Sequence, residues 1–278
     1  MKLIVITAVA LVLAPATASA AVYAGGTSRG DPIAITLAKS GKLQKIGISW
    51  IAQCQSGRHY TFGGMLVSTR KRPSLIMPGD NPLFGSIKKN KLKATSIGAL
   101  VFADGSSGSV SQRISGKLKP TYAAGTWSAT IDVLDPDGNP VDRCSTGTFR
   151  WTARRGPTVY GGSTTQGEPV VVEVAPSRTR VTYFGFAWDA SCPDGSLRFA
   201  ENLGNFALTE GGAFGDQWTD DYPFSDGSGK ASFSYAVSGK LRKGRGSGTL
   251  SIDIEETDSG GAPVMSCHSN PVRWNVSQ

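Results

Sequence analysis

The sequence predicts an all-β protein built of two tandem antiparallel β-sandwich domains that are related by internal duplication. Three observations predict this fold class. Apolar residues alternate with polar ones over short runs, helical periodicity is almost absent, and glycine and proline interrupt the chain at short intervals. In addition, two long stretches of the chain repeat each other.

The first twenty residues have the form of a secretory signal peptide. Lys2 precedes an apolar run at 3–13, and Ala18-Ser19-Ala20 provides a cleavage site before Ala21. No later stretch approaches the roughly 20 apolar residues that a transmembrane helix needs. We therefore expect a signal peptide at 1–20, no membrane span, and a secreted protein that is extracellular or associated with the cell surface.

The duplication defines the domains. Residues 114–151 align without a gap with residues 237–274, and both contain Ser-Gly-Lys-Leu, Gly-Thr, Gly-x-Pro-Val, a cysteine and a closing Arg-Trp. We expect one domain at 21–155 and a second at 156–278. A residue kept in both copies is expected to serve the fold, so functional residues are sought where the copies differ.

The strands follow from the alternation and the turns from glycine and proline. Alternating segments lie at 33–37, 46–50 and 170–174. Turn residues at 135–138 and 258–261 divide the C-terminal half of each copy into an antiparallel meander. Trp50 and Cys54 are four residues apart, so an extended strand directs both to the same side, which we expect to be the core.

Four cysteines in an exported chain indicate two disulfide bonds. Three pairings are open, and the duplication favours one bond within each domain. The expected bonds are Cys54 with Cys144 and Cys192 with Cys267. No Cys-x-x-Cys pair is present, and only His59 and His268 could join the cysteines, so we expect neither a metal nor another cofactor.

The shared Ser-Gly-Lys stretch, the Gly-Thr strand and the terminal cysteine and tryptophan strand resemble exported tandem β-sandwich repeat proteins of high-GC bacteria. The resemblance covers nearly all of the chain after the signal peptide. It implies export and a β fold, and it implies no activity.

Charge distinguishes the two copies. The formal net charge is +8. Residues 58–113 hold nine basic and two acidic residues, whereas residues 193–236 hold two basic and seven acidic residues. Clustered cations attract polyanions by releasing counterions. We predict binding of an acidic polysaccharide or another cell-envelope polymer, and no intracellular nucleic acid, through Arg70, Lys71, Arg72, Lys88, Lys89, Lys91 and Lys93. The alternative is that the basic insert docks on the acidic one.

A second candidate group lies in the acidic insert. Trp218, Asp220, Asp221 and Tyr222 have no counterpart in the first copy. Aromatic faces beside carboxylates suit a sugar ring, which offers C–H groups for stacking and hydroxyls for hydrogen bonds. These four residues are therefore a candidate glycan-binding group, and the alternative is a loop held to the domain by its own aromatic side chains.

The function favoured by these patterns is binding without catalysis. The two histidines occupy unrelated positions in the copies, and no Gly-x-Ser-x-Gly elbow is present, so no catalytic residue is assigned. Two alternatives stay open. One is a secreted carbohydrate-active hydrolase that uses carboxylates between Asp216 and Asp226, and the other is a purely structural or self-associating protein.

Overall fold

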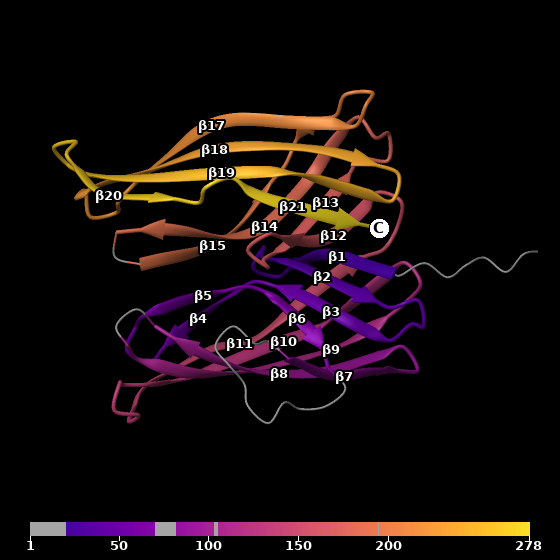
Figure 1. Ribbon diagram of the computed structural model, residues 1–278, viewed down its shortest axis with the longest axis horizontal. Helices are drawn as coiled ribbons and strands as arrows, with labels where there is room; N and C mark the ends of the chain where they lie inside the picture. Colours follow the sequence, from indigo (N-terminus) through magenta and orange to yellow (C-terminus); the bar gives the residue numbers. More distant parts are fainter. Residues whose placement is uncertain (1–20, 70–81, 103–104, 194) are drawn as a thin grey trace, which may run out of the picture.

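The computed structural model describes residues 21–69, 82–102, 105–193 and 195–278. The expected signal peptide and the candidate residues Arg70, Lys71 and Arg72 lie outside the described residues. The described chain forms twenty-one strands in two sheets (Figure 1), and it contains no helix with the length and apolar character to cross a membrane. The all-β prediction is confirmed.

The first sheet contains eleven strands in the order β1-β2-β3-β6-β7-β8-β9-β10-β11-β4-β5. Their bounds are β1 Ala21–Thr27, β2 Pro32–Leu37, β3 Leu43–Ile48, β4 Trp50–Cys54, β5 His59–Phe62, β6 Met65–Ser68, β7 Pro82–Lys88, β8 Lys91–Val101, β9 Ser107–Leu118, β10 Tyr122–Leu134 and β11 Pro140–Arg154. Strand β1 pairs with β11 as well as with β2, so the strands from β1 to β11 in this order close into a ring. Among the described strands of this sheet, only β6 and β7 pair in parallel.

The second sheet follows the order β15-β14-β13-β12-β21-β19-β18-β17. Its strands are β12 Val159–Thr164, β13 Pro169–Val174, β14 Arg180–Cys192, β15 Gly195–Leu203, β16 Phe206–Ala207, β17 Ala213–Pro223, β18 Gly229–Arg242, β19 Arg245–Asp258, β20 Pro263–His268 and β21 Val272–Ser277. Strand β16 pairs with β14, and β20 pairs with both β14 and β19. No ladder between described residues joins β15 to β17, so these strands remain sheet edges.

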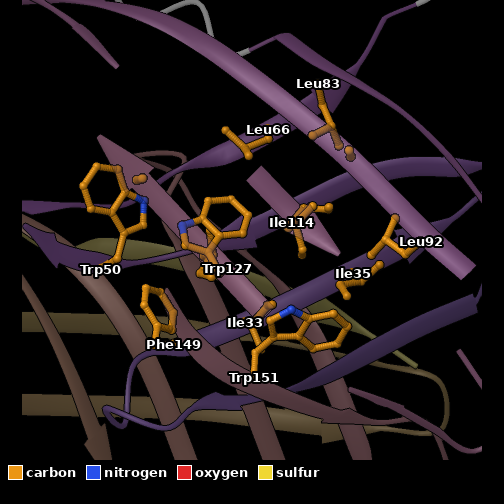
Figure 2. Close-up of a cluster of buried hydrophobic side chains, with 14 of the residues drawn as sticks. Ile33, Ile35, Trp50, Leu66, Leu83, Leu92, Ile114, Trp127, Phe149 and Trp151 are labelled. Carbon is orange, nitrogen blue, oxygen red and sulfur yellow. The ribbon is translucent and has the colours of Figure 1, made fainter. Parts of the chain in front are cut away.

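Each sheet bends around its own core. Figure 2 shows Trp50, Trp127 and Trp151 gathered inside the first sheet with apolar side chains from several strands. The second core is built in the same way around Trp188 and Trp274. We expected β-sandwiches, and the sheets form barrel-like arrangements, because long, twisted strands curl when many of them pair side by side.

Both disulfide bonds have the expected partners. Cys54 at the end of β4 is bonded to Cys144 of β11, which lies directly opposite it in the ladder. Cys192 at the end of β14 is bonded to Cys267 of β20. Each bond therefore links two strands of one sheet.

The two sheets pack against each other through small side chains of their first strands. Ala24 and Ala34 contact Val159 and Val171 in a separate buried cluster. A Cβ on Gly161 would lie 2.8 Å from a methyl of Val22, so glycine permits this close approach. The Tyr183 hydroxyl adds a hydrogen bond to the Gly30 carbonyl, at 3.2 Å.

Candidate binding faces

The predicted lysines lie on strands whose side chains alternate between the core and solvent. Leu92 and Ala94 of β8 are buried, whereas Lys91 and Lys93 between and beside them are exposed. A β-strand directs successive side chains to opposite faces, so the lysines share the outer face. The apolar residues that build the core of the first sheet thus hold the lysines outward.

Strand register brings further cations to this outer face. Lys91 lies opposite Lys88 on one side and opposite Lys117 on the other. Lys93 begins a row that crosses Ser115 and Thr126 and ends at Arg150. We call this surface the basic face and define it by Lys88, Lys91, Lys93, Arg113, Lys117 and Arg150, all of which are exposed.

The charge of the basic face is not compensated. Among the residues that the structure describes, no carboxylate forms an ion pair with any of its six cations. Asp132, farther along β10, is paired with Arg143 at 3.4 Å. Like charges directly opposite each other in a ladder are destabilising. An anion bound across Lys88, Lys91 and Lys117 would relieve this repulsion.

The basic face is also hollowed. A depression of about 520 Å³ lies between Lys93 and Arg113. Its other lining residues include the hydroxyl side chains Thr95, Ser115, Thr126, Ser128 and Thr148, and the ring of Phe84. The Ser115 and Thr126 hydroxyls lie 3.0 Å apart across the ladder. Cations, hydroxyls and an aromatic ring together suit a charged sugar better than a bare phosphate chain.

The structure places the predicted residues of this group unequally. Lys88, Lys91 and Lys93 belong to the basic face, while Lys89 occupies the β7–β8 turn with a φ of 46°. The predicted binding residues did not include Arg113, Lys117 and Arg150. Lys117 was assigned to the scaffold because Lys240 repeats it, yet the alternation Ser111, Arg113, Ser115, Lys117 could have shown that it faces solvent.

The two charged inserts touch through β5 and β15, where Arg198 Nη1 donates a 3.3 Å hydrogen bond to the Gly63 carbonyl, but no described ion pair joins the basic face to a carboxylate of the acidic insert. In Figure 1, β7 and β8 lie at the bottom of the molecule and β17 and β18 at the top, with the packed β1 and β12 strands between them. Docking of the basic face on the acidic insert through ion pairs is therefore not observed among the described residues. The six cations of the basic face are exposed in the described part of the chain.

The predicted glycan-binding residues divide between two faces of β17. Trp218, Asp220 and Tyr222 occupy every second position of β17, so their side chains share one face. Asp221 points to the other, where Lys230 Nζ and Ser232 Oγ each lie 2.6 Å from its carboxylate. These hydrogen bonds lower the pKa of Asp221. Asp221 therefore does not belong to a site formed by the other three.

Asp220 and Tyr222 line a second hollow, of about 420 Å³, between the edges β15 and β17. Trp218 stacks on Tyr235 with a centroid separation of 4.8 Å and donates a hydrogen bond of 2.9 Å from Nε1 to Asp220 Oδ2. The Tyr235 hydroxyl donates a hydrogen bond of 3.0 Å to Glu201 Oε1. The stacked rings thus hold two carboxylates at one hollow.

Glu201 was not singled out from the sequence. The pKa of Glu201 is raised to about 7, chiefly by burial and also by the nearby charge of Asp220, although the hydrogen bond from Tyr235 lowers it. No carboxylate aligns with Glu201 in the first copy. The fold brings β15 close to β17, and the sequence does not reveal this proximity. The only sequence signal was an acidic residue unique to one copy.

A hydrogen-bonded row on β19 and β20 has the order of a catalytic triad. His268 Nδ1 lies 2.8 Å from Asp253 Oδ1, and Ser266 Oγ lies 3.2 Å from His268 Nε2. Asp253 and His268 are neighbours in the ladder, and Ser266 is two residues from His268 on the same strand face. The Asp253 and His268 side chains are 49% and 58% exposed. Because these side chains are exposed, water competes for their hydrogen bonds. We therefore interpret the row as polar side chains on the solvent face of the hairpin and not as a catalytic triad.

The one group of metal-ligand residue types found among the described residues is Cys54, Asp142 and Cys144. Both cysteines are consumed by a disulfide bond, so neither offers a thiolate. This group therefore does not form a metal site.

Comparisons of the chain with protein-family models, with curated proteins and with solved structures found no match.

Proposed function

We propose that the protein is secreted and binds an acidic extracellular polysaccharide through the basic face. The observation that carries this proposal is the set of six exposed cations on one sheet face without an ion pair to a described carboxylate. Export is supported by the signal-like sequence at 1–20 and by two disulfide bonds, which persist in oxidising compartments. The hydroxyl-lined hollow favours a glycan among the possible polyanions.

We further propose that the chain is a tandem duplication with domains at 21–155 and 156–278. Gly116 pairs with Gly125 under the ring of Trp151, and Gly239 pairs with Gly248 under Trp274. These glycines are those of the repeated Ser-Gly-Lys and Gly-Thr motifs. The Thr146 hydroxyl accepts a 2.8 Å hydrogen bond from the Ala129 amide, and Ser269 and Ile252 repeat it.

Lysine removal tests the basic face. The triple variant Lys91→Ala/Lys93→Ala/Lys117→Ala is expected to bind immobilised polygalacturonate at least about tenfold more weakly at low salt. The slope of log K against log salt should fall by about one for each lost ion contact. Both quantities can be measured by titration at several salt concentrations.

The matched control is Lys240→Ala/Arg242→Ala/Lys243→Ala, which removes the same charge from exposed positions of the second sheet. It should retain most of the affinity. Equal losses in the two triple variants would show that net charge alone drives binding, and an unchanged slope in the first would refute the basic face as the contact surface.

The hollow of Glu201 and Asp220 favours a second candidate function, hydrolysis of a glycan. Glu201 would protonate the glycosidic oxygen while Asp220 accepts a proton from the attacking water. Two carboxylates repel polyanions, so a neutral glycan is the expected substrate. Because Glu201 must be protonated, activity should fall as pH rises through about 7.

The assay is release of reducing ends from neutral polysaccharides such as xylan, galactan and amylose. Glu201→Gln should lower the rate at least about a hundredfold. Asp221→Asn, on the opposite face of β17, should leave the rate unchanged. Absence of release from every neutral glycan, or full activity of Glu201→Gln, would remove this candidate function.

A further inference from the structure

A cavity of about 430 Å³ lies where the two sheets meet. Trp50, Phe62, Leu66, Leu100 and Val110 of the first sheet form its apolar wall. Gln166, Glu168 and Arg198 of the second sheet close its polar end. Cavities of this size accept small organic molecules. None of the first-sheet residues that line it carries a charge.

Most donors of Arg198 already have partners. Its Nε and Nη2 donate hydrogen bonds of 2.6 and 3.0 Å to the two oxygens of Asp189. Its Nη1 lies 3.3 Å from the Gly63 carbonyl of the first sheet, and Nη2 lies 3.3 Å from Glu168 Oε1. The guanidinium is thus fixed by partners from both sheets.

Glu168 is the group in the cavity with unused capacity. The residue is 2% exposed, and its Oε2 has no hydrogen-bond partner. That oxygen lies against Gly63, where any larger residue would collide with it. A buried carboxylate oxygen without a partner is costly, so the site is incomplete by itself.

The charges at the polar end are also unbalanced. Asp189 and Glu168 share a single guanidinium, which leaves one excess negative charge when both acids are ionised. The pKa of Glu168 is raised to about 7, chiefly by burial and also by the charge of Asp189, although the charge of Arg198 lowers it. At neutral pH a proton therefore neutralises the excess charge in part of the molecules.

We propose that this cavity binds a small organic monocation, an ammonium ion with an apolar body. The ammonium group donates to Glu168 Oε2 and completes the charge balance. The apolar body contacts Trp50 and Phe62, whose ring centroids are 4.7 Å apart. Aromatic faces attract cations in addition to burying apolar surface. This proposal is independent of the basic face and of the Glu201 hollow.

The test uses the full chain and three probes of similar shape: 2-phenylethylammonium, neutral 2-phenylethanol and anionic 3-phenylpropionate. We expect saturable binding of the ammonium probe by calorimetry, and at least tenfold weaker binding of the other two. Glu168→Gln should lower the ammonium affinity at least tenfold. Asp31→Asn should not, because Asp31 holds the corresponding position in the first sheet but does not line the cavity.

Proton release supplies a readout that needs no variant. The ammonium competes with the proton for Glu168, so binding near pH 7 should release protons, and affinity should fall as pH is lowered below 7. Calorimetry in two buffers with different ionisation enthalpies measures this release. Equal binding of the neutral probe, binding without proton release, or unchanged affinity of a folded Glu168→Gln variant would each overturn the proposal.

Discussion

Gly125→Ala is expected to lower the free energy of unfolding by about 3 kcal/mol or more, although it adds only one methyl group. A Cβ at this position would lie closer than 3.0 Å to the Ser115 carbonyl and to the Cα of Gly116, both of which belong to the neighbouring strand. Backbone atoms in a ladder cannot move aside without breaking hydrogen bonds. The ring of Trp151 covers the same glycine pair, so β9 and β10 cannot separate on that side either.

Urea unfolding followed by circular dichroism and tryptophan fluorescence measures the loss. Gly248→Ala should act similarly, because Gly248 meets the Ser238 carbonyl and Trp274 in the same way. Gly156→Ala is the control, since nothing lies within 4 Å of a Cβ there, and it should change stability by less than about 0.5 kcal/mol. A mild effect of Gly125→Ala would show that the strands relax apart, against the packing described here.

Removal of the Cys54–Cys144 bond should have the largest effect on stability. The bond joins residues separated by 90 positions. The chain-entropy model gives about 4 to 5 kcal/mol for a loop of this length, because the open chain gains conformations in the unfolded state. The double variant Cys54→Ala/Cys144→Ala keeps the second disulfide and is compared with the wild type by urea unfolding.

The corresponding variant Cys192→Ala/Cys267→Ala opens a loop of similar length, with a separation of 75 residues, and should lose a similar amount. A loss below about 1 kcal/mol in the first pair would contradict the prediction. It would mean that residual structure already restricts the unfolded chain between these cysteines, so the crosslink removes few conformations.

Local patterns were sufficient for the strand content and the disulfide pairing. Trp50 and Cys54 are both buried, as their spacing predicted, and the repeated positions of the cysteines selected the observed bonds among three. Ring closure was not predictable in the same way. The β1–β11 pairing joins segments far apart in the sequence, and the β6–β7 pairing is parallel. No residue pattern in any of these four strands specifies its partner.

The candidate sites show the limit of comparing the two copies. The rule that shared residues serve the fold explained Gly116 and Gly239, but it hid Lys117, a shared residue that faces solvent. Glu168 was hidden for the same reason, since it aligns with Asp31. The Glu168 side chain is one methylene longer than that of the aligned Asp31, and it pairs with Arg198 of β15. These two differences underlie the role proposed for Glu168 in the cavity. Such pairs depend on tertiary packing that alternation does not encode.

The small residues between the sheets have a mechanical consequence. Ala24, Ala34 and Gly161 allow the two sheets to pack closely against each other. This packing fixes the orientation of one sheet relative to the other. Strands β7 and β8 of the first sheet and strands β17 and β18 of the second sheet lie on opposite sides of the molecule (Figure 1). A polymer bound to the basic face, as proposed above, would lie on the side of the molecule away from β17 and β18.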